Sequence, residues 1–178
     1  MAKAAFLDRD GIVNLDKGYV HLSQDFEWNH GIFTLLEALH AHGFMLLLCT
    51  NQSGIGRGFY NFHTFCKLCL FMQQTLQKRL GFCFDRIYFC PHTPEFGCEC
   101  RKPKAGMIER ACVDFPQLCL RDCILIGDSY TDILAGRAAG VGRKFLLGSA
   151  QGSLWENEHI IGKLGDVVIK LHNIDSIA

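Results

Sequence analysis

The sequence has no long uninterrupted apolar run and no surplus of either charge. Its longest strongly apolar run, residues 44–49, is far shorter than the roughly 20 residues that a membrane-spanning helix needs. Lysine and arginine number 18, as do aspartate and glutamate, and no segment is a basic run, so we expect neither nucleic acid nor a membrane as a partner. Asp8, Arg9 and Asp10 come too early for the apolar core of a signal peptide, which favours a cytoplasmic protein.

The length and the cysteines set further bounds. A chain of 178 residues can bury one sizeable core but is too short to form two domains that each bury a stable core. We therefore expect a single domain over residues 1–178. Disulfide scaffolds are usually smaller, and Cys49, Cys112 and Cys123 lie inside apolar stretches. The 10 cysteines therefore indicate free thiols in a reducing compartment. No apolar surface stripe is evident, so we expect a monomer.

Short apolar runs alternate with stretches of helical periodicity. The runs that we predict as strands are residues 4–7, 44–49, 87–90, 123–126, 145–147 and 167–171. Near-continuous apolarity is typical of parallel strands that are covered on both faces. Apolar residues repeat at helical spacing within residues 32–39 and 62–80, and Asn61 is the predicted N-cap of the second helix. This alternation predicts a doubly wound α/β domain with a parallel, Rossmann-type sheet.

Polar residues follow four of the predicted strands at the sheet edge where open α/β proteins bind ligands. They are Asp8, Arg9 and Asp10 after the first strand, Thr50 to Ser53 after the second, Arg101 and Lys102 after the third, and Asp128 with Asp132 after the fourth. Each has a plain structural explanation: Asp10 and Gly11 can form a turn, and Asp128 can cap a helix. The glycine spacing excludes an EF-hand calcium loop. Their coincidence at successive strand ends favours one site.

This set of residues fits phosphoryl transfer through a covalent aspartyl phosphate. Asp8 would attack phosphorus, and Asp10, on the same side of an extended chain, would protonate the leaving alkoxide and later activate water. A carboxylate is repelled by a phosphate at roughly 4 kcal/mol per charge pair at about 4 Å and an effective dielectric near 20, so cations must be present. We expect Mg²⁺ on the Asp8 and Asp128 carboxylates and the Asp10 carbonyl. Lys102 and the Thr50 hydroxyl would contact the other phosphoryl oxygens.

The segment CPHTPEFGCEC, residues 90–100, contains four soft metal ligands: Cys90, His92, Cys98 and Cys100. Three sulfurs and one nitrogen make a closed tetrahedral zinc site with no vacancy for water, so the zinc would hold the shape of the loop. Because Arg101 and Lys102 follow directly, a fixed loop would fix these two cations. The alternative is a set of exposed thiols and a surface imidazole.

The sequence resembles the haloacid dehalogenase-like hydrolases, whose four signature motifs match DRDG at residues 8–11, Thr50, Lys102, and Gly127-Asp128 with Asp132. Ile12 departs from the threonine that is common in this group. Residues 18–21, 50–58 and 90–103 are similar to the D-glycero-D-manno-heptose 1,7-bisphosphate 7-phosphatases and to the related histidinol-phosphate phosphatases. The resemblance implies a phosphoric monoester hydrolase that requires Mg²⁺ and carries structural Zn²⁺. With no large insertion after the first or third strand, it also implies a fold without a cap domain.

The resemblance further implies roles for individual residues. Arg101 would help to recognise the substrate, and Lys102 would stabilise the transition state. The sugar site would be lined by two groups of residues: Asp16 and Tyr19, and Asn51, Gln52 and Ser53. The expected substrate is the heptose bisphosphate, on the route to lipopolysaccharide core and other surface glycans. Two alternatives stay open at this point: a histidinol-phosphate phosphatase of histidine biosynthesis, and an inactive zinc-stabilised binding protein.

Overall fold

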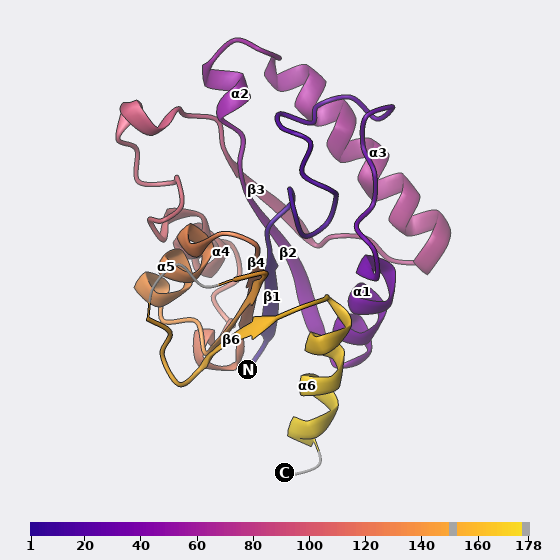
Figure 1. Cartoon of the computed structure of the whole chain (residues 1–178), viewed down its shortest axis with the longest axis vertical. Helices are drawn as coiled ribbons and strands as arrows, with labels where there is room; N and C mark the ends of the chain where they lie inside the picture. Colours follow the sequence, from indigo (N-terminus) through magenta and orange to yellow (C-terminus); the bar gives the residue numbers. More distant parts are fainter. Residues whose placement is uncertain (150–152, 176–178) are drawn as a thin grey trace.

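The computed structural model describes residues 1–149 and 153–175, which form a parallel sheet between two layers of helices (Figure 1). The strands are β1 (Lys3–Leu7), β2 (Phe44–Asn51), β3 (Arg86–Cys90), β4 (Ile124–Gly127), β5 (Arg143–Leu147) and β6 (Glu158–Ile161). Their spatial order is β3-β2-β1-β4-β5-β6, and neighbours run parallel. The helices are α1 (Ile32–Ala41), α2 (Ser53–Gly56), α3 (Phe62–Leu80), α4 (Gly106–Asp114), α5 (Tyr130–Ala139) and α6 (Gly165–Asp175). The predicted α/β sheet is therefore confirmed.

The two faces of the sheet are buried under different helices. In β1, Ala5 and Leu7 belong to the core beneath α1, α3 and α6, whereas Ala4 and Phe6 belong to the core beneath α4 and α5 (Figure 1). Because successive side chains of a strand point to opposite faces, a strand that is covered on both faces needs apolar residues at every position. This explains the continuous apolar runs from which the strands were predicted.

The long helix α3 begins and ends as its sequence predicts. The side chain of Asn61 accepts a hydrogen bond from the backbone nitrogen of Thr64 at 2.9 Å, as an N-cap does. The helix ends at Gly81, whose φ of 81° lies in the left-handed region that favours glycine. Its apolar stripe, which includes Leu68 and Met72, is buried against the sheet.

One predicted strand is wrong. Residues 167–171 lie in α6, and a sixth strand, β6, precedes that helix and pairs with β5. The buried residues Leu164, Val167 and Leu171 are three and four positions apart, which is the spacing of a helix face. A short run that is apolar except for Lys170 fits a buried strand and a buried helix turn equally well, so the run alone could not decide between them.

Two long loops leave the carboxyl edge of the sheet. Residues 8–31 connect β1 to α1, and residues 91–105 connect β3 to α4 and include a short 3₁₀ turn, Pro94–Phe96. Both loops, with α2, lie around the end of β1 (Figure 1). Within the described residues, no helix has the length and apolarity to span a membrane.

Candidate active site

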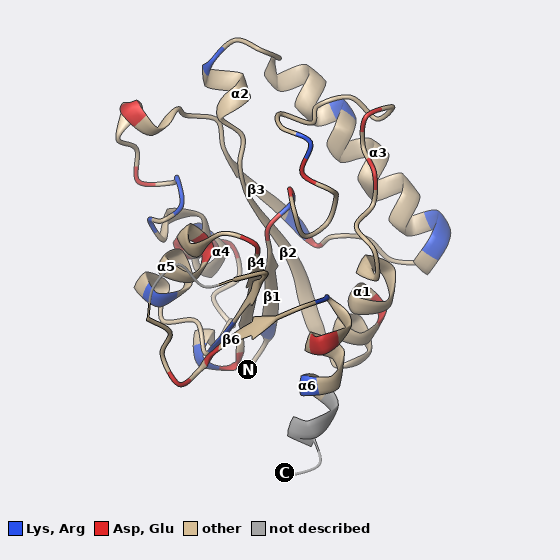
Figure 2. Ribbon diagram, in the orientation of Figure 1, with Lys and Arg blue, Asp and Glu red and all other residues tan. Residues whose placement is uncertain are grey.

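The parallel register brings the predicted residues together at one edge of the sheet. β1 lies between β2 and β4, so Asp8 leaves the sheet beside Thr50 in β2 and Asp128 after β4. A hollow of about 290 Å³ lies there, lined by Asp8, Arg9, Asp10, Asp16, Gly18, Tyr19, Thr50, Asn51, Gln52, Ser53, Tyr60, Lys102, Asp128 and Thr131. In the charge-coloured ribbon, red and blue segments, which mark acidic and basic residues, lie near one another beyond the end of β1 (Figure 2).

Three carboxylates gather where the hollow meets the sheet: Asp8 and Asp128 line the hollow, and Asp132 lies beside them. One oxygen from each of Asp8, Asp128 and Asp132 lies within 4.8 Å of the others. Burial raises the pKa of Asp8 to about 7, although the charge of Lys102 lowers it, and burial raises the pKa of Asp128 to about 6. Hard oxygen ligands of this kind suit Mg²⁺, whose charge would favour the ionised carboxylates.

Asp128 is held close to the first loop because Gly11 has no side chain. The φ of Gly11 is 82°, and a Cβ atom there would overlap the carboxylate of Asp128. Asp132 differs from Asp128, since both of its oxygens have partners in the fold. One accepts from the backbone nitrogen of Ser129 at 3.1 Å and the other pairs with Lys102 at 2.5 Å. Asp132 thus caps α5 and holds a cation at the same time.

Lys102 is a buried ammonium with a full set of partners. Its Nζ lies 2.8 Å from an oxygen of Asp8, 2.5 Å from one of Asp132 and 2.8 Å from the carbonyl oxygen of Cys49. Burial alone would lower the pKa of Lys102, but Asp132 and Asp8 outweigh it and raise that pKa, so the side chain is charged. Asn51 fixes the Lys102 backbone through two hydrogen bonds of 3.1 Å: its Oδ1 accepts from the Lys102 N–H, and its Nδ2 donates to the Lys102 carbonyl oxygen.

Asp10 is oriented by donors that sequence reasoning did not single out. Arg9 is fully buried, and its Nη2 donates to both carboxylate oxygens of Asp10 at 2.7 and 2.8 Å and to the carbonyl of Val20 at 2.7 Å. Asn14 donates to Asp10 at 3.0 Å, and Gln52 donates at 3.1 Å. Arg9 therefore connects Asp10 to Val20, which lies farther along the same loop. No signal in the sequence beyond its place in the first motif pointed to this.

Predicted sugar-site residues lie on the rim and wall of the hollow. The carboxylate of Asp16 accepts from the backbone nitrogen of Gly18 at 2.9 Å, which shapes the turn before Tyr19. Tyr19 is 46% exposed, has a φ of 51°, and contacts Phe59 edge to face at 4.8 Å. Gln52 is instead buried, with its amide turned toward Asp10. The structure does not bring Arg101 to this hollow: it lines a smaller one on the cysteine-rich loop and donates to the carbonyl of His92 at 3.3 Å.

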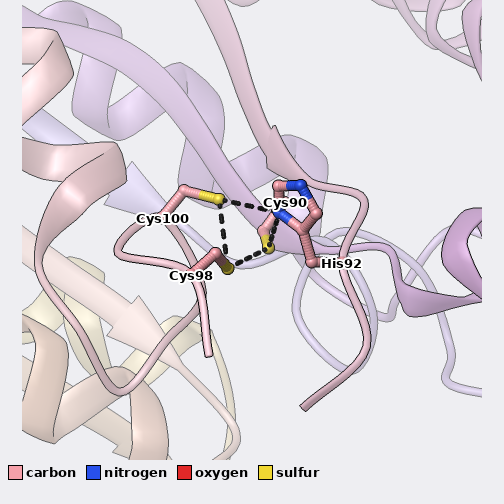
Figure 3. A group of neighbouring side chains, drawn as sticks. All are labelled: Cys90, His92, Cys98 and Cys100. Atoms are coloured by element: carbon pink, nitrogen blue, oxygen red, sulfur yellow. Dashed lines mark hydrogen bonds between the residues drawn. The ribbon is translucent and has the colours of Figure 1, made fainter. Parts of the chain in front are cut away.

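The four soft ligands predicted in residues 90–100 meet at one point (Figure 3). The sulfur of Cys90 lies 3.6 Å from Nδ1 of His92 and 3.5 Å from the sulfur of Cys98, and that of Cys100 lies 3.4 Å from each of the same two atoms. With Zn–S bonds of about 2.3 Å and Zn–N bonds of about 2.0 Å, the edges of a zinc tetrahedron measure roughly 3.5 to 3.8 Å. The donor set and its spacing therefore fit zinc.

Known proteins resemble this chain along most of its length. The family model described as "HAD-hyrolase-like" matches residues 99–149. The D-glycero-beta-D-manno-heptose-1,7-bisphosphate 7-phosphatase of Helicobacter pylori is 51% identical over 145 residues, covering 82% of this chain and 83% of the relative. The D-glycero-alpha-D-manno-heptose-1,7-bisphosphate 7-phosphatase of Campylobacter jejuni is 46% identical over 145 residues, 82% of each chain.

A solved structure extends the similarity to the whole fold. The crystal structure of D,D-heptose 1,7-bisphosphate phosphatase from B. bronchiseptica, complexed with magnesium and phosphate, superimposes with a TM-score of 0.87. Its sequence is 30% identical, and the match covers 96% of this chain and 98% of that chain.

Proposed function

This chain belongs to the heptose-1,7-bisphosphate 7-phosphatases of the haloacid dehalogenase-like hydrolases, and we propose that it removes the 7-phosphate through an aspartyl phosphate on Asp8. The observation that carries the mechanism is the contact of the Asp8 carboxylate with the Lys102 ammonium, beside Asp128. A buried cation next to a carboxylate can receive the charge of an incoming phosphate.

The first half of the reaction uses Asp8 and Asp10. The Asp8 oxygen forms a bond to phosphorus as the bond between phosphorus and the sugar oxygen breaks, and Asp10 gives its proton to that oxygen. Lys102 and the Thr50 hydroxyl donate to the phosphoryl oxygens. Mg²⁺, held by Asp8, Asp128 and the Asp10 carbonyl, would supply electrostatic stabilisation of the phosphoryl group.

The second half restores the enzyme. Asp10, now a carboxylate, accepts a proton from water as the water oxygen attacks phosphorus. The bond between phosphorus and Asp8 breaks, and inorganic phosphate leaves. Because Arg9 and Asn14 hold Asp10 in place throughout, the same carboxyl group can serve as acid and then as base.

The cysteine-rich loop has a supporting role in this proposal. Zn²⁺ on Cys90, His92, Cys98 and Cys100 holds the loop that ends at Arg101 and Lys102. Asp16, Tyr19, Asn51 and Ser53 around the hollow recognise the part of the substrate that leaves, whereas Arg101 lines a neighbouring hollow on the cysteine-rich loop. The loops of residues 8–31 and 91–105 stand where a cap domain would be inserted, so the site is capless. We further propose that residues 1–178 act as one domain, as a monomer, in the cytoplasm.

A paired assay tests the function. Purified protein with Mg²⁺ is given heptose 1,7-bisphosphate and histidinol phosphate in parallel, and phosphate release is measured. We expect faster turnover of the heptose bisphosphate and loss of turnover when Asp8 is replaced by asparagine. Faster hydrolysis of histidinol phosphate by a large factor would overturn the substrate assignment, and unchanged activity in Asp8→Asn would overturn the covalent mechanism.

A further inference from the structure

Tyr60 lies outside every motif in the sequence, yet it reaches the active site. It precedes α3, is 8% exposed, and lies on the wall of the hollow. Its ring stacks on that of His21, with centroids 4.7 Å apart and planes at 5°. Its hydroxyl donates a hydrogen bond of 2.7 Å to the side-chain oxygen of Gln52.

Gln52 bridges two groups that take part in the proposed chemistry. It is 2% exposed, and its Nε2 donates to the Thr50 hydroxyl oxygen at 2.8 Å and to a carboxylate oxygen of Asp10 at 3.1 Å. Both hydrogens of the amide are used in this way, and the amide oxygen accepts from Tyr60. A flipped amide would place its oxygen against Asp10, where neither atom can donate once Asp10 is the ionised carboxylate that the second half of the reaction requires.

We infer that Tyr60 and Gln52 act as one positioning unit, in which the Tyr60 hydroxyl fixes the Gln52 amide so that it holds Asp10 and Thr50 together. The inference rests on the proposed function, since it assigns these two residues to the support of Asp10 and Thr50. Gln52 was predicted to bind the sugar, but both hydrogens of its amide are already donated to Thr50 and Asp10, so it has no donor left for a sugar hydroxyl. Tyr60 and Gln52 are thus positioning residues.

The protonation of Tyr60 agrees with this role. Burial raises the pKa of Tyr60 to about 12; the charge of Arg9 opposes that rise and the charge of Asp10 adds to it. The phenol therefore keeps the proton that it donates to Gln52. Thr50 accepts from Gln52, so its own hydroxyl hydrogen is free to point at a phosphoryl oxygen.

The test compares two substrates and two tyrosines. Tyr60→Phe keeps the ring that stacks on His21 and removes only the hydroxyl. Tyr88→Phe is the matched control, because that buried tyrosine donates to Asp114 at 3.0 Å and does not line the hollow. For each variant, kcat/KM is measured with heptose 1,7-bisphosphate and with 4-nitrophenyl phosphate. The phenolate of the second substrate leaves without needing a proton.

We expect Tyr60→Phe to lower kcat/KM about 10-fold for the sugar bisphosphate, because an acid that is less well placed loses part of its roughly 10² to 10⁴-fold effect. The loss for 4-nitrophenyl phosphate should be much smaller, and KM should change less than kcat. Tyr88→Phe should leave both substrates unaffected. Equal losses on the two substrates would mean that the unit does not support proton donation by Asp10, and would overturn the inference.

A second variant tests whether the two residues act together. Gln52→Leu, of similar size, should lower kcat/KM for the sugar bisphosphate at least as much as Tyr60→Phe, and the double variant should be no worse than Gln52→Leu alone. If the losses in kcat/KM of the two single variants add up in the double variant, the two residues act independently and the inference is overturned. Thermal unfolding of each variant checks that it folds. An inactive wild-type protein would refute the proposed function, whereas an active wild type with a fully active Tyr60→Phe variant refutes only this inference.

Discussion

The ammonium of Lys102 lies 2.8 Å from a carboxylate oxygen of Asp8, and both side chains are largely removed from solvent. Asp132 holds the same ammonium from the other side. The proposed nucleophile and the cation that would receive the phosphoryl charge therefore lie side by side in the structure.

Replacing Lys102 should remove this charge from the reaction. We expect Lys102→Gln to lower kcat by about 10² to 10³-fold, as the loss of a transition-state donor does elsewhere. Lys104→Gln is the matched control: Lys104 lies two residues away and pairs with Glu99 at 2.7 Å on the exposed part of the loop. Steady-state phosphate release measures both. Similar losses in the two variants would contradict the role given to Lys102.

A methyl group at Gly11 should displace Asp128. In Gly11→Ala, the new Cβ atom overlaps the Asp128 carboxylate, in addition to the strain of a φ of 82°. Gly43→Ala is the control, because Gly43 has a φ of 75° but no atom within 4 Å of the added Cβ. Strain alone should cost about 1 to 2 kcal/mol of unfolding free energy in both.

Only Gly11→Ala should also require a higher Mg²⁺ concentration for half-maximal activity. Titration of phosphate release with Mg²⁺ checks this. An unchanged requirement in Gly11→Ala would show that Asp128 is not positioned through this contact.

Loss of one sulfur should empty the zinc site. We expect the wild-type protein to keep about one zinc per chain through dialysis, and Cys98→Ser to lose most of it and to unfold at a lower temperature. Cys112→Ser, which alters a half-buried cysteine of α4, should keep its zinc. Elemental analysis and thermal unfolding measure the two effects. A wild-type protein free of zinc after purification without chelator would contradict the assignment.

Acid should weaken the link between β6 and α5. Burial would raise the pKa of Glu158, but hydrogen bonds from Arg137 and from the backbone nitrogen of Trp155 outweigh it and lower that pKa; Lys144, 4.0 Å away, also faces the carboxylate. The ionised side chain therefore stabilises the fold above the unfolded pKa of about 4.3, and this contribution is lost as pH falls through the folded pKa.

Glu158→Gln provides the measurement. The variant should be less stable than the wild type at pH 7, and the difference between their denaturant midpoints should shrink below about pH 4. A difference that stays constant or grows on acidification would contradict the sign of this effect.

Sequence reasoning found the residues that leave the strands, because a parallel sheet brings the ends of its strands to one edge whatever the loops do. Asp8, Thr50, Lys102 and Asp128 could be predicted for that reason. The cluster of Cys90, His92, Cys98 and Cys100 could also be predicted, since the spacing of these residues within 11 positions allows them to meet.

The contacts of Arg9 and Tyr60 could not be predicted. They depend on the paths of residues 8–31 and of the turn before α3, where no periodic pattern constrains the backbone. The strand predicted for residues 167–171 was wrong for a different reason: Ile169 is exposed between buried Val167 and Leu171, as in a helix, and the apolar run itself does not reveal that exposure.

The amide of Asn51 forms the same pair of hydrogen bonds with Lys102 that a neighbouring strand would form. The side-chain amide of Asn51 therefore takes the place of a backbone peptide group and pairs with Lys102, beyond the end of β3. The stretch between Cys90 and Lys102 is thus held at its start by Cys90 and His92, which meet Cys98 and Cys100 near its end, and at Lys102 by the two hydrogen bonds from Asn51. A change of length within residues 93–97, between His92 and Cys98, would therefore alter the path of the loop and leave the backbone of Lys102 fixed beside β2.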